Sequence, residues 1–402
     1  MEPPIWLSDN PQRYGPLQGE ARADVAVVGG GIAGLTAAYL LSSSGVGVAV
    51  IEAGKIGSGE SGRGAAMGTV QQGLCFTRLV RLHGQGRAAN IVKAYQAAVH
   101  LIAGIVAKEE LRCGLSVQDS FVFTTDARRV GAVEREAELA SRFGLDAGLT
   151  NIAPFLLPYR VAACVRGQIT LNPAQYLAGL AGTIATQGGV IFEDSPVIEV
   201  GKGAVRTNSG RLRAKCVLIA TGIPILQPPH YGSLRLLQGT GWAASVCGEP
   251  LPIGIWQNAS DGFAFRAASD QLIVCSGDSG RAVLTKEAFL RNLARYLPDA
   301  KSVAWPIHSI HTLDGLPDIG RYKTDDGCLF VATGFGRWGL TCGTLAGDIL
   351  CDLVLDKPNP MAELFSPQRL PSPIAIGGAF ARGLAKGVKN VASSVRNQSF
   401  AL

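Results

Sequence analysis

The sequence predicts an α/β protein with two domains, one built on a largely parallel sheet and one on a mixed sheet with helices. The first evidence lies near the N-terminus, where Asp24–Val28 and Val46–Ile51 are apolar at almost every position. Such runs are typical of parallel strands that are covered on both faces. Between them, Ile32–Ser43 has a helical composition rich in Ala and Leu, and Gly45 follows where a helix C-cap is expected. These segments form one βαβ unit.

The bulk composition is that of a globular chain of 402 residues with two or three domains. Hydrophobic residues make up 47% and charged residues 17%, so large cores can form and global disorder is excluded. The net charge of +6 is modest and most basic residues are scattered, so we expect no nucleic-acid binding. The nine cysteines show no C-x-x-C spacing, and Met1–Glu20 has no apolar signal core. Both features favour buried thiols and a cytoplasmic protein.

A glycine fingerprint lies between the first strand and the first helix. Gly29, Gly31 and Gly34 satisfy G-x-G-x-x-G, in which the glycines permit a tight turn, approach to a pyrophosphate and close packing of helix on strand. The helix N-terminus then offers free N–H groups to the phosphates. Glu52 ends the second strand, at the spacing of an acid that binds the ribose hydroxyls. This unit therefore predicts a Rossmann-like dinucleotide site.

A second glycine-rich loop, Gly57–Gly64, follows shortly after Glu52. A backbone that wraps further along the ligand suits a long cofactor, so the loop favours FAD over NAD.

The rest of the chain continues the α/β order. We expect further elements at Ala88–Glu110 (helix), Ser120–Thr125 (strand), Arg128–Phe143 (helix), Asn172–Gln187 (helix), three short strands within 190–207, Cys216–Ala220 (strand), Leu236–Cys275 (β-rich), Lys286–Tyr296 (helix), Leu329–Thr333 (strand) and Thr344–Leu355 (helix). The sheet that binds the dinucleotide is then assembled from residues 1–85, 160–235 and 305–370. Residues 86–159 and 236–304 form the second, substrate domain.

Residues 371–402 form a separate basic tail. The stretch Ile374–Arg396 mixes Arg and Lys with Ala, Val and Phe, which fits either an amphipathic helix on a membrane or a plain surface helix. We favour the surface helix.

The chain resembles the FAD-dependent amine oxidase family that includes D-amino-acid oxidase, glycine oxidase and sarcosine oxidase. The likeness covers nearly the whole chain and is strongest to bacterial members related to gamma-glutamylputrescine oxidoreductase and to those with an appended Rieske domain. It is carried by the fingerprint, by Ile56–Arg63, Phe121–Asp126 and Cys216–Gly222, and by the two C-terminal segments Asp314–Gly320 and Ala332–Thr341.

The resemblance implies a set of FAD contacts. Gly29, Gly31 and Gly34 would meet the pyrophosphate, and Glu52 the adenosine ribose. The remaining positions that the resemblance assigns to the cofactor are Ser61, Gly62, Arg63 and Gly64 beside the pyrophosphate and ring, Val197 at adenine, Thr221 and Gly222 at the passing strand, and Gly336, Trp338, Gly339, Leu340 and Thr341 at the pyrimidine end of the isoalloxazine.

The sequence departs from the family at several positions. Related chains often have Arg-Asn-Gly-Gly where Arg63-Gly64-Ala65-Ala66 stands here. Sarcosine oxidases place a His and a Lys where this chain has Trp338 and Thr341, and they tether FAD through a cysteine in the region of Ile307. Since no cysteine lies there, we expect non-covalent FAD. With no cysteine after Cys351, we also expect no Rieske cluster.

The candidate substrate-binding residues are Trp338, His308 and Arg281. Trp338 is either an aromatic wall of the substrate pocket or a packing residue, and we adopt the wall. His308 would face the flavin, and Arg281 or Arg266 would bind a carboxylate unless they are solvated surface arginines. His308 and His311 would point to opposite faces of a strand and lack carboxylate or cysteine partners, so we expect no metal site.

The function expected from the resemblance is oxidation of the C–N bond of a small amine or amino acid by hydride transfer to flavin N5. The imine would hydrolyse, and oxygen or an electron-carrier protein would reoxidise the flavin. Two alternatives remain open: an FAD dehydrogenase of a non-amine C–H substrate, and a flavin-binding subunit with little turnover.

Overall fold

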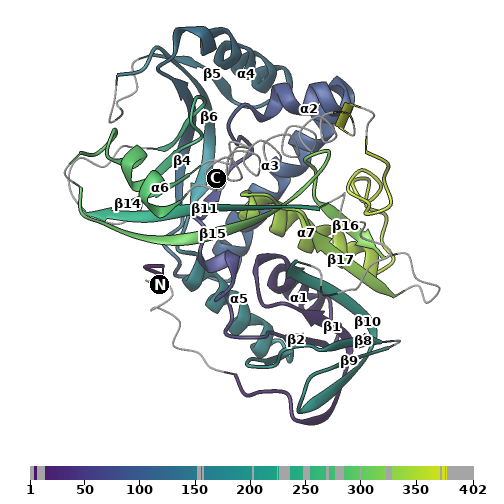
Figure 1. Ribbon diagram of the computed structural model, residues 1–402. Helices are drawn as coiled ribbons and strands as arrows, with labels where there is room; N and C mark the ends of the chain where they lie inside the picture. The colour runs from purple at the N-terminus through teal and green to yellow at the C-terminus, as the bar shows by residue number, and fades with distance from the viewer. Residues whose placement is uncertain are drawn as a thin grey trace, which may run out of the picture.

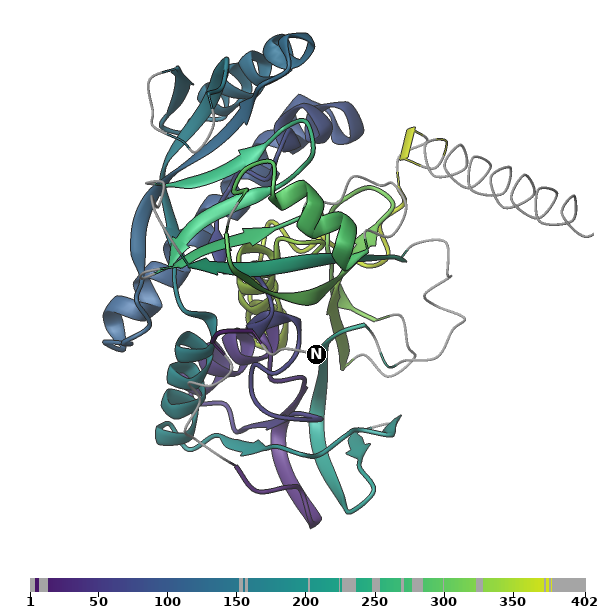
Figure 2. The same ribbon diagram turned by 60° about the vertical axis from the view of Figure 1, so that its left-hand side comes forward.

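The fold of the chain is known from a computed structural model (Figure 1). It describes residues 4–6, 14–151, 155, 158–201, 203–223, 225, 236–247, 254–268, 271–276, 285–298, 300–322, 328–371, 374, 375 and 377. Two large sheets organise this part of the chain, one with eight strands and one with nine. Figures 1 and 2 show them as separate layers, with helices packed between and around them.

The eight-stranded sheet carries the fingerprint. Its path runs β16-β17-β10-β1-β2-β7, and all neighbours from β17 to β7 are parallel. The strands of this sheet are β1 (Gly19–Val28), β2 (Val48–Ile51), β7 (Val190–Phe192), β8 (Glu199–Gly201), β9 (Ala204–Arg206), β10 (Gly210–Gly222), β16 (Asp318–Arg321) and β17 (Leu329–Thr333). Every residue of β2 is buried, as its uniformly apolar sequence predicts.

The nine-stranded sheet is mostly antiparallel and follows the path β15-β11-β14-β13-β12-β4-β6-β3, with β5 beside β6. Its strands are β3 (Met67–Gly68), β4 (Ser116–Thr124), β5 (Ala147–Thr150), β6 (Val161–Thr170), β11 (Leu236–Cys247), β12 (Ile255–Asn258), β13 (Ala264–Ala268), β14 (Gln271–Cys275) and β15 (Ser302–Thr312). The long strands β11 and β15 cross the middle of the molecule toward α7 (Figure 1).

The helices are α1 (Ile32–Ser43), α2 (Cys75–His83), α3 (Gln85–Lys108), α4 (Val130–Arg142), α5 (Pro173–Thr186), α6 (Lys286–Leu293) and α7 (Gly339–Val354), with short 3-10 turns at Glu60–Gly62 and Ala127–Arg129. The side chain of Asn172 accepts hydrogen bonds from the first-turn amides of α5, which confirms the expected N-cap there. By length and composition α3 could cross a membrane, but its residues Ile91 and Ile102 are fully buried in the main core. It is a core helix.

Helices α1 and α7 lie in contact because α7 presents glycines to α1. A β-carbon on Gly347 would come within 2.6 Å of the Cβ of Thr36, and one on Gly343 within 3.0 Å of the Ile32 side chain. The spacing of four residues puts both glycines on one face of α7.

The domain boundaries differ from those expected from the sequence. Strands β6 (Val161–Thr170) and β15 (Ser302–Thr312) belong to the nine-stranded sheet, whereas the sequence assigned all of β6 and residues 305–312 of β15 to the dinucleotide domain. Helix α7 also begins at Gly339, five residues before the expected start at Thr344. Most of the tail at 371–402 lies outside the described residues, so its helical character stays a prediction.

The contact between α1 and α7 leads to a prediction about stability. Gly347→Ala should lower the free energy of unfolding by about 1–3 kcal/mol, because the added methyl group overpacks Thr36. Gly104→Ala on α3 is the matched control: its β-carbon meets nothing within 4 Å, so it should be neutral or stabilise by up to about 1 kcal/mol. Thermal or urea unfolding measures both. Equal stability of Gly347→Ala and wild type would show that the helices do not pack this closely.

Candidate cofactor site

The turn between β1 and α1 is built on close backbone contacts. Gly29 has φ +114°, and a β-carbon there would lie 2.5 Å from the carbonyl oxygen of Ala220 on β10. A β-carbon on Gly34 would overlap the carbonyl oxygen of Gly29. Both positions therefore require glycine, and the turn brings the start of α1 to the carboxyl ends of β1 and β10, where parallel sheets bind ligands.

The N-terminus of α1 presents free amides. The first intrahelical bond runs from the Leu35 amide to the carbonyl of Gly31, so the preceding amides have no partner within the helix. The hydroxyl of Ser61 accepts the Ile32 N–H at 3.0 Å and would lie 2.8 Å from a β-carbon on Gly31. The second glycine loop is thus fixed against the helix end, which leaves the amides of Ala33 and Gly34 for an anion.

Glu52 stands at the carboxyl end of β2. Its two carboxylate oxygens accept N–H bonds from Gly30 (2.7 Å) and Gly54 (2.9 Å). The carboxylate therefore links the fingerprint turn to the start of the next loop, in the position of an acid that binds a ribose.

Glu193 is a positioning residue that the sequence analysis missed. It is fully buried, and its carboxylate accepts the amides of Ile56 (2.8 Å) and Tyr14 (3.1 Å). It follows β7, directly beside the end of β2, because the Glu52 amide donates to the carbonyl of Phe192. In the sequence, the only signal for a role of Glu193 is its position directly after a short apolar strand. Val197 lies in the following loop, two residues after Ser195, whose amide donates to the carbonyl of Glu52 at 2.9 Å, and its expected place at adenine stays a prediction.

The strand end Thr221-Gly222 lies beside β17, where the Thr333 hydroxyl donates to the carbonyl of Gly222. Gly29 packs against the residue just before it, Ala220. This strand end therefore does pass the fingerprint turn.

The N-terminus of α7 is a second set of free amides. The first intrahelical bond joins the Cys342 amide to the carbonyl of Trp338, and the N-cap residue makes no side-chain bond to the helix. The amides of Gly339, Leu340 and Thr341 thus have no partner within the helix. Gly336 has φ +60° and turns the chain into this helix end.

Trp338 packs in the core. Its side chain is 6% exposed, its ring lies 4.6 Å from that of Tyr95, and its indole N–H donates to the carbonyl of Thr69 at 2.6 Å. These contacts make Trp338 a positioning residue for the Thr69 backbone, and its expected role as a wall of the substrate pocket stays a prediction.

His308 lies on β15 and is half-exposed. Its ring Nδ1 is 3.0 Å from a carboxylate oxygen of Glu60, and its backbone amide donates to the other oxygen at 2.7 Å. It thus joins the nine-stranded sheet to the second glycine loop. Its expected role toward substrate stays a prediction, as does that of Arg281, which lies outside the described residues.

Arg266 pairs with no carboxylate among the described residues, and it is not a solvated surface residue. It is 2% exposed, and its guanidinium donates to the carbonyls of Ala65 and Leu171. The surface interpretation of Arg266 was wrong because β13 places its side chain beneath the glycine loop.

His311 and Arg337 lie where the nine-stranded sheet meets the last glycine loop. The ring of His311 would be 3.1 Å from a β-carbon on Gly336 and bonds the Ser309 hydroxyl. The guanidinium of Arg337 lies over Gly241 of β11 and reaches the Ser276 hydroxyl at 3.4 Å. The sequence analysis placed no function on Arg337, although it stands within the glycine segment that the resemblance singled out.

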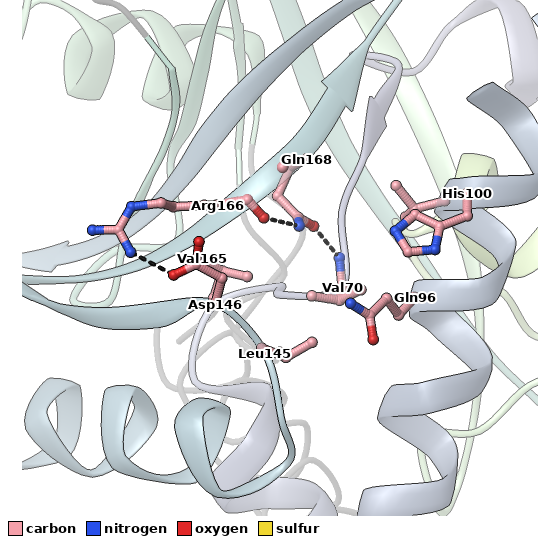
Figure 3. Close-up of a pocket in the computed structure, with 10 residues that line it drawn as sticks. Val70, Gln96, His100, Leu145, Asp146, Val165, Arg166 and Gln168 are labelled. Carbon is pink, nitrogen blue, oxygen red and sulfur yellow. Dashed lines mark hydrogen bonds and ion pairs between the residues drawn. The ribbon is translucent and has the colours of Figure 1, made fainter. Parts of the chain in front are cut away.

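A small cavity of about 80 Å³ lies between α3 and β6 (Figure 3). In the figure, Gln168 bridges the carbonyl of Arg166 and the amide of Val70, and Arg166 pairs with Asp146. Ligand pockets usually measure about 300–1,000 Å³, so this cavity suits a few water molecules rather than a substrate. No cluster of three or more metal-ligating side chains occurs among the described residues.

Comparison with known proteins identifies the family. The family model described as FAD dependent oxidoreductase (DAO) matches residues 24–353. The chain belongs to this family of FAD-dependent oxidoreductases. A Bacillus subtilis (strain 168) relative, named for a Rieske 2Fe-2S iron-sulfur protein, is 28% identical over 88% of this chain and 72% of its own. Gamma-glutamylputrescine oxidoreductase of Escherichia coli (strain K12) is 24% identical over 87% and 88%.

The solved structures agree on the fold. Glycine oxidase from Geobacillus kaustophilus superposes with a TM-score of 0.73 at 22% identity, covering 87% of this chain and 99% of that one.

The residues of this oxidoreductase fit FAD. Two helix ends with free amides suit the pyrophosphate and the electron-rich pyrimidine edge of the flavin. The carboxylate of Glu52 suits the adenosine ribose, and the backbone of Ser61–Gly64 runs from the first helix end toward the second. The individual contacts expected from the sequence stay predictions.

Glu52 provides a direct test of the cofactor contacts. Glu52→Gln keeps the size of the side chain but replaces one acceptor with a donor, which would face the Gly30 or Gly54 amide. Charged hydrogen bonds contribute about 1.5–3 kcal/mol, so FAD should bind about 10–100-fold more weakly. Titration of the apoprotein measures this. Glu199→Gln, on an exposed pair with Arg206, should leave the affinity unchanged. Equal affinities for both variants would refute the role of Glu52.

The mode of attachment of FAD is tested separately. We predict that acid precipitation leaves a colourless pellet and a yellow supernatant that contains FAD. All nine cysteines are free, and the sequence of β15 around Ile307 contains none. A pellet that stays yellow would show a covalent bond.

Proposed function

We propose that this oxidoreductase oxidises the C–N bond of a small amine or amino acid. The observation that carries the proposal is the junction of α7 with the nine-stranded sheet, where the Gly336 turn faces β11 and β15. Three similar proteins support the substrate class by their names: gamma-glutamylputrescine oxidoreductase, glycine oxidase and L-amino acid deaminase.

A bound FAD would supply the hydride acceptor for oxidation of the carbon next to the amine nitrogen, and the oxidised product would hydrolyse in water. The chain supplies position and charge. The free amides at the start of α7 would stabilise negative charge at the pyrimidine edge. Arg337 and His311, at the junction with β11 and β15, stand where a polar substrate group can be oriented.

The surroundings of this junction favour a dry site. Trp338, Leu340 and Thr341 are each at most 6% exposed. An amine loses its proton more readily in a pocket from which water is excluded, and only the neutral amine can release hydride. Reacting atoms must lie about 3–3.5 Å apart, so the rate would depend steeply on how the junction positions the substrate.

The acceptor and the compartment belong to the same proposal. Oxygen or an electron-carrier protein would reoxidise the flavin. Nine free thiols, none joined in a disulfide, support a reducing compartment such as the cytoplasm.

The proposal is tested by anaerobic reduction of the bound FAD. We expect at least one compound in a panel of small amines and amino acids to bleach the flavin absorbance. Matched hydroxy compounds such as glycolate for glycine and lactate for alanine are the controls, since they differ only in replacing nitrogen with oxygen.

The alternatives give different results. Bleaching by hydroxy acids but not by amines would show a dehydrogenase of a non-amine substrate. Bleaching by dithionite but by no substrate would favour a flavin-binding subunit.

A further inference from the structure

The backbone segment from Ser61 to Thr69 runs between the two helix ends that face the cofactor. At one end, the Ser61 hydroxyl accepts the Ile32 N–H of α1 at 3.0 Å. At the other end, the Thr69 amide donates to the Thr341 hydroxyl of α7 at 3.1 Å, and Thr341 donates back to the Thr69 carbonyl at 2.9 Å. A segment tied to both helix ends must run alongside the flavin half of the cofactor.

The middle of this segment is held by side chains of the nine-stranded sheet. The indole N–H of Trp305 on β15 donates to the carbonyl of Arg63 at 2.8 Å. The Nε of Arg266 on β13 donates to the carbonyl of Ala65. The next residue, Ala66, has φ +49°, a left-handed conformation that costs energy for alanine and persists only when its surroundings hold it.

Arg266 is an unusual residue for this place. It is 2% exposed, and its Nη2 donates to the carbonyl of Leu171 at 2.9 Å. The ring of Trp6 covers its guanidinium at 5.1 Å. Among the described residues no carboxylate forms an ion pair with it. Burial lowers the pKa of Arg266 to about 9, so it is still a cation at neutral pH.

Packing alone does not account for an arginine here. An apolar side chain of similar length would fill the space without the cost of burying a charge. What the guanidinium supplies is a rigid fork of donors, which can bond the Ala65 and Leu171 carbonyls together.

We propose that Arg266 is a positioning residue for FAD, which fixes the Ala65–Ala66 backbone in the conformation that the bound flavin requires. The proposal rests on FAD binding alone and not on the substrate proposed above. It also gives Trp6, near the N-terminus, a role, because the Trp6 ring shields Arg266 from water.

The test compares Arg266→Met and Arg266→Lys with a control, Arg129→Met. Arg129 also donates to a backbone carbonyl, that of Ala259 at 3.0 Å, but in the substrate domain away from the segment. The dissociation constant for FAD is measured by titrating each apoprotein, and the melting temperature of each apoprotein is measured in parallel.

We expect Arg266→Met to weaken FAD binding about 10–100-fold, the range for loss of a hydrogen bond to a charged group. The apoprotein should melt within a few degrees of wild type, because relief of the buried charge offsets the two unpaired carbonyls. The FAD affinity of Arg266→Lys should lie between those of Arg266→Met and wild type, because an ammonium lacks the forked donors of a guanidinium. Arg129→Met should bind FAD within about twofold of wild type.

An FAD affinity of Arg266→Met within twofold of wild type would overturn the proposal. Equal weakening by Arg129→Met would overturn it too, since the effect would then be general destabilisation. If Arg266→Met does not fold, the test is made on Arg266→Lys by measuring amide hydrogen exchange. Amides of residues 65–68 should exchange faster than in wild type when FAD is bound, and unchanged exchange there would refute the positioning role.

Discussion

The contact between α1 and α7 is the constraint on which the cofactor site depends. The two helices come from opposite ends of the described chain, and Gly343 and Gly347 let α7 pack directly against Ile32 and Thr36 of α1. Their N-termini consequently lie at one site, each with free amides. FAD extends from its pyrophosphate to its flavin, and each of these groups is stabilised by the positive end of a helix. The packing of the two glycines of α7 against α1 therefore determines the electrostatics of the site.

The second glycine loop links the two domains, in addition to the packing of α3 against α7. Trp305 and Arg266 reach from the nine-stranded sheet to carbonyls of this loop, while Ser61 and Thr69 tie it to the helices of the other domain. A shift of one sheet relative to the other would therefore move the backbone beside the flavin. Under the proposed function, this arrangement would couple substrate binding at the junction to cofactor binding.

The sequence predicted the parts of the fold that depend on local chemistry. Uniformly apolar strands, the glycine fingerprint, Glu52 and the Asn172 cap each act over a few residues, and the structure has β1, α1, β2 and α5 where they were expected. The membership of β6 and β15 in the second sheet could not be predicted, because strand pairing depends on partners far away in sequence. For the same reason the burial of Arg266 was missed, because it depends on Trp6, which no local pattern connects to Arg266.

The bonds between the nine-stranded sheet and the second glycine loop contribute unequally to the position of the loop. The pair of His308 and Glu60 is open to water, with about 43% and 46% of the side chains exposed, and such pairs contribute little because solvent screens them. The bonds from Trp305 and Arg266 are buried, where a carbonyl that loses its donor cannot turn to water instead. The position of the loop is therefore set by the buried donors.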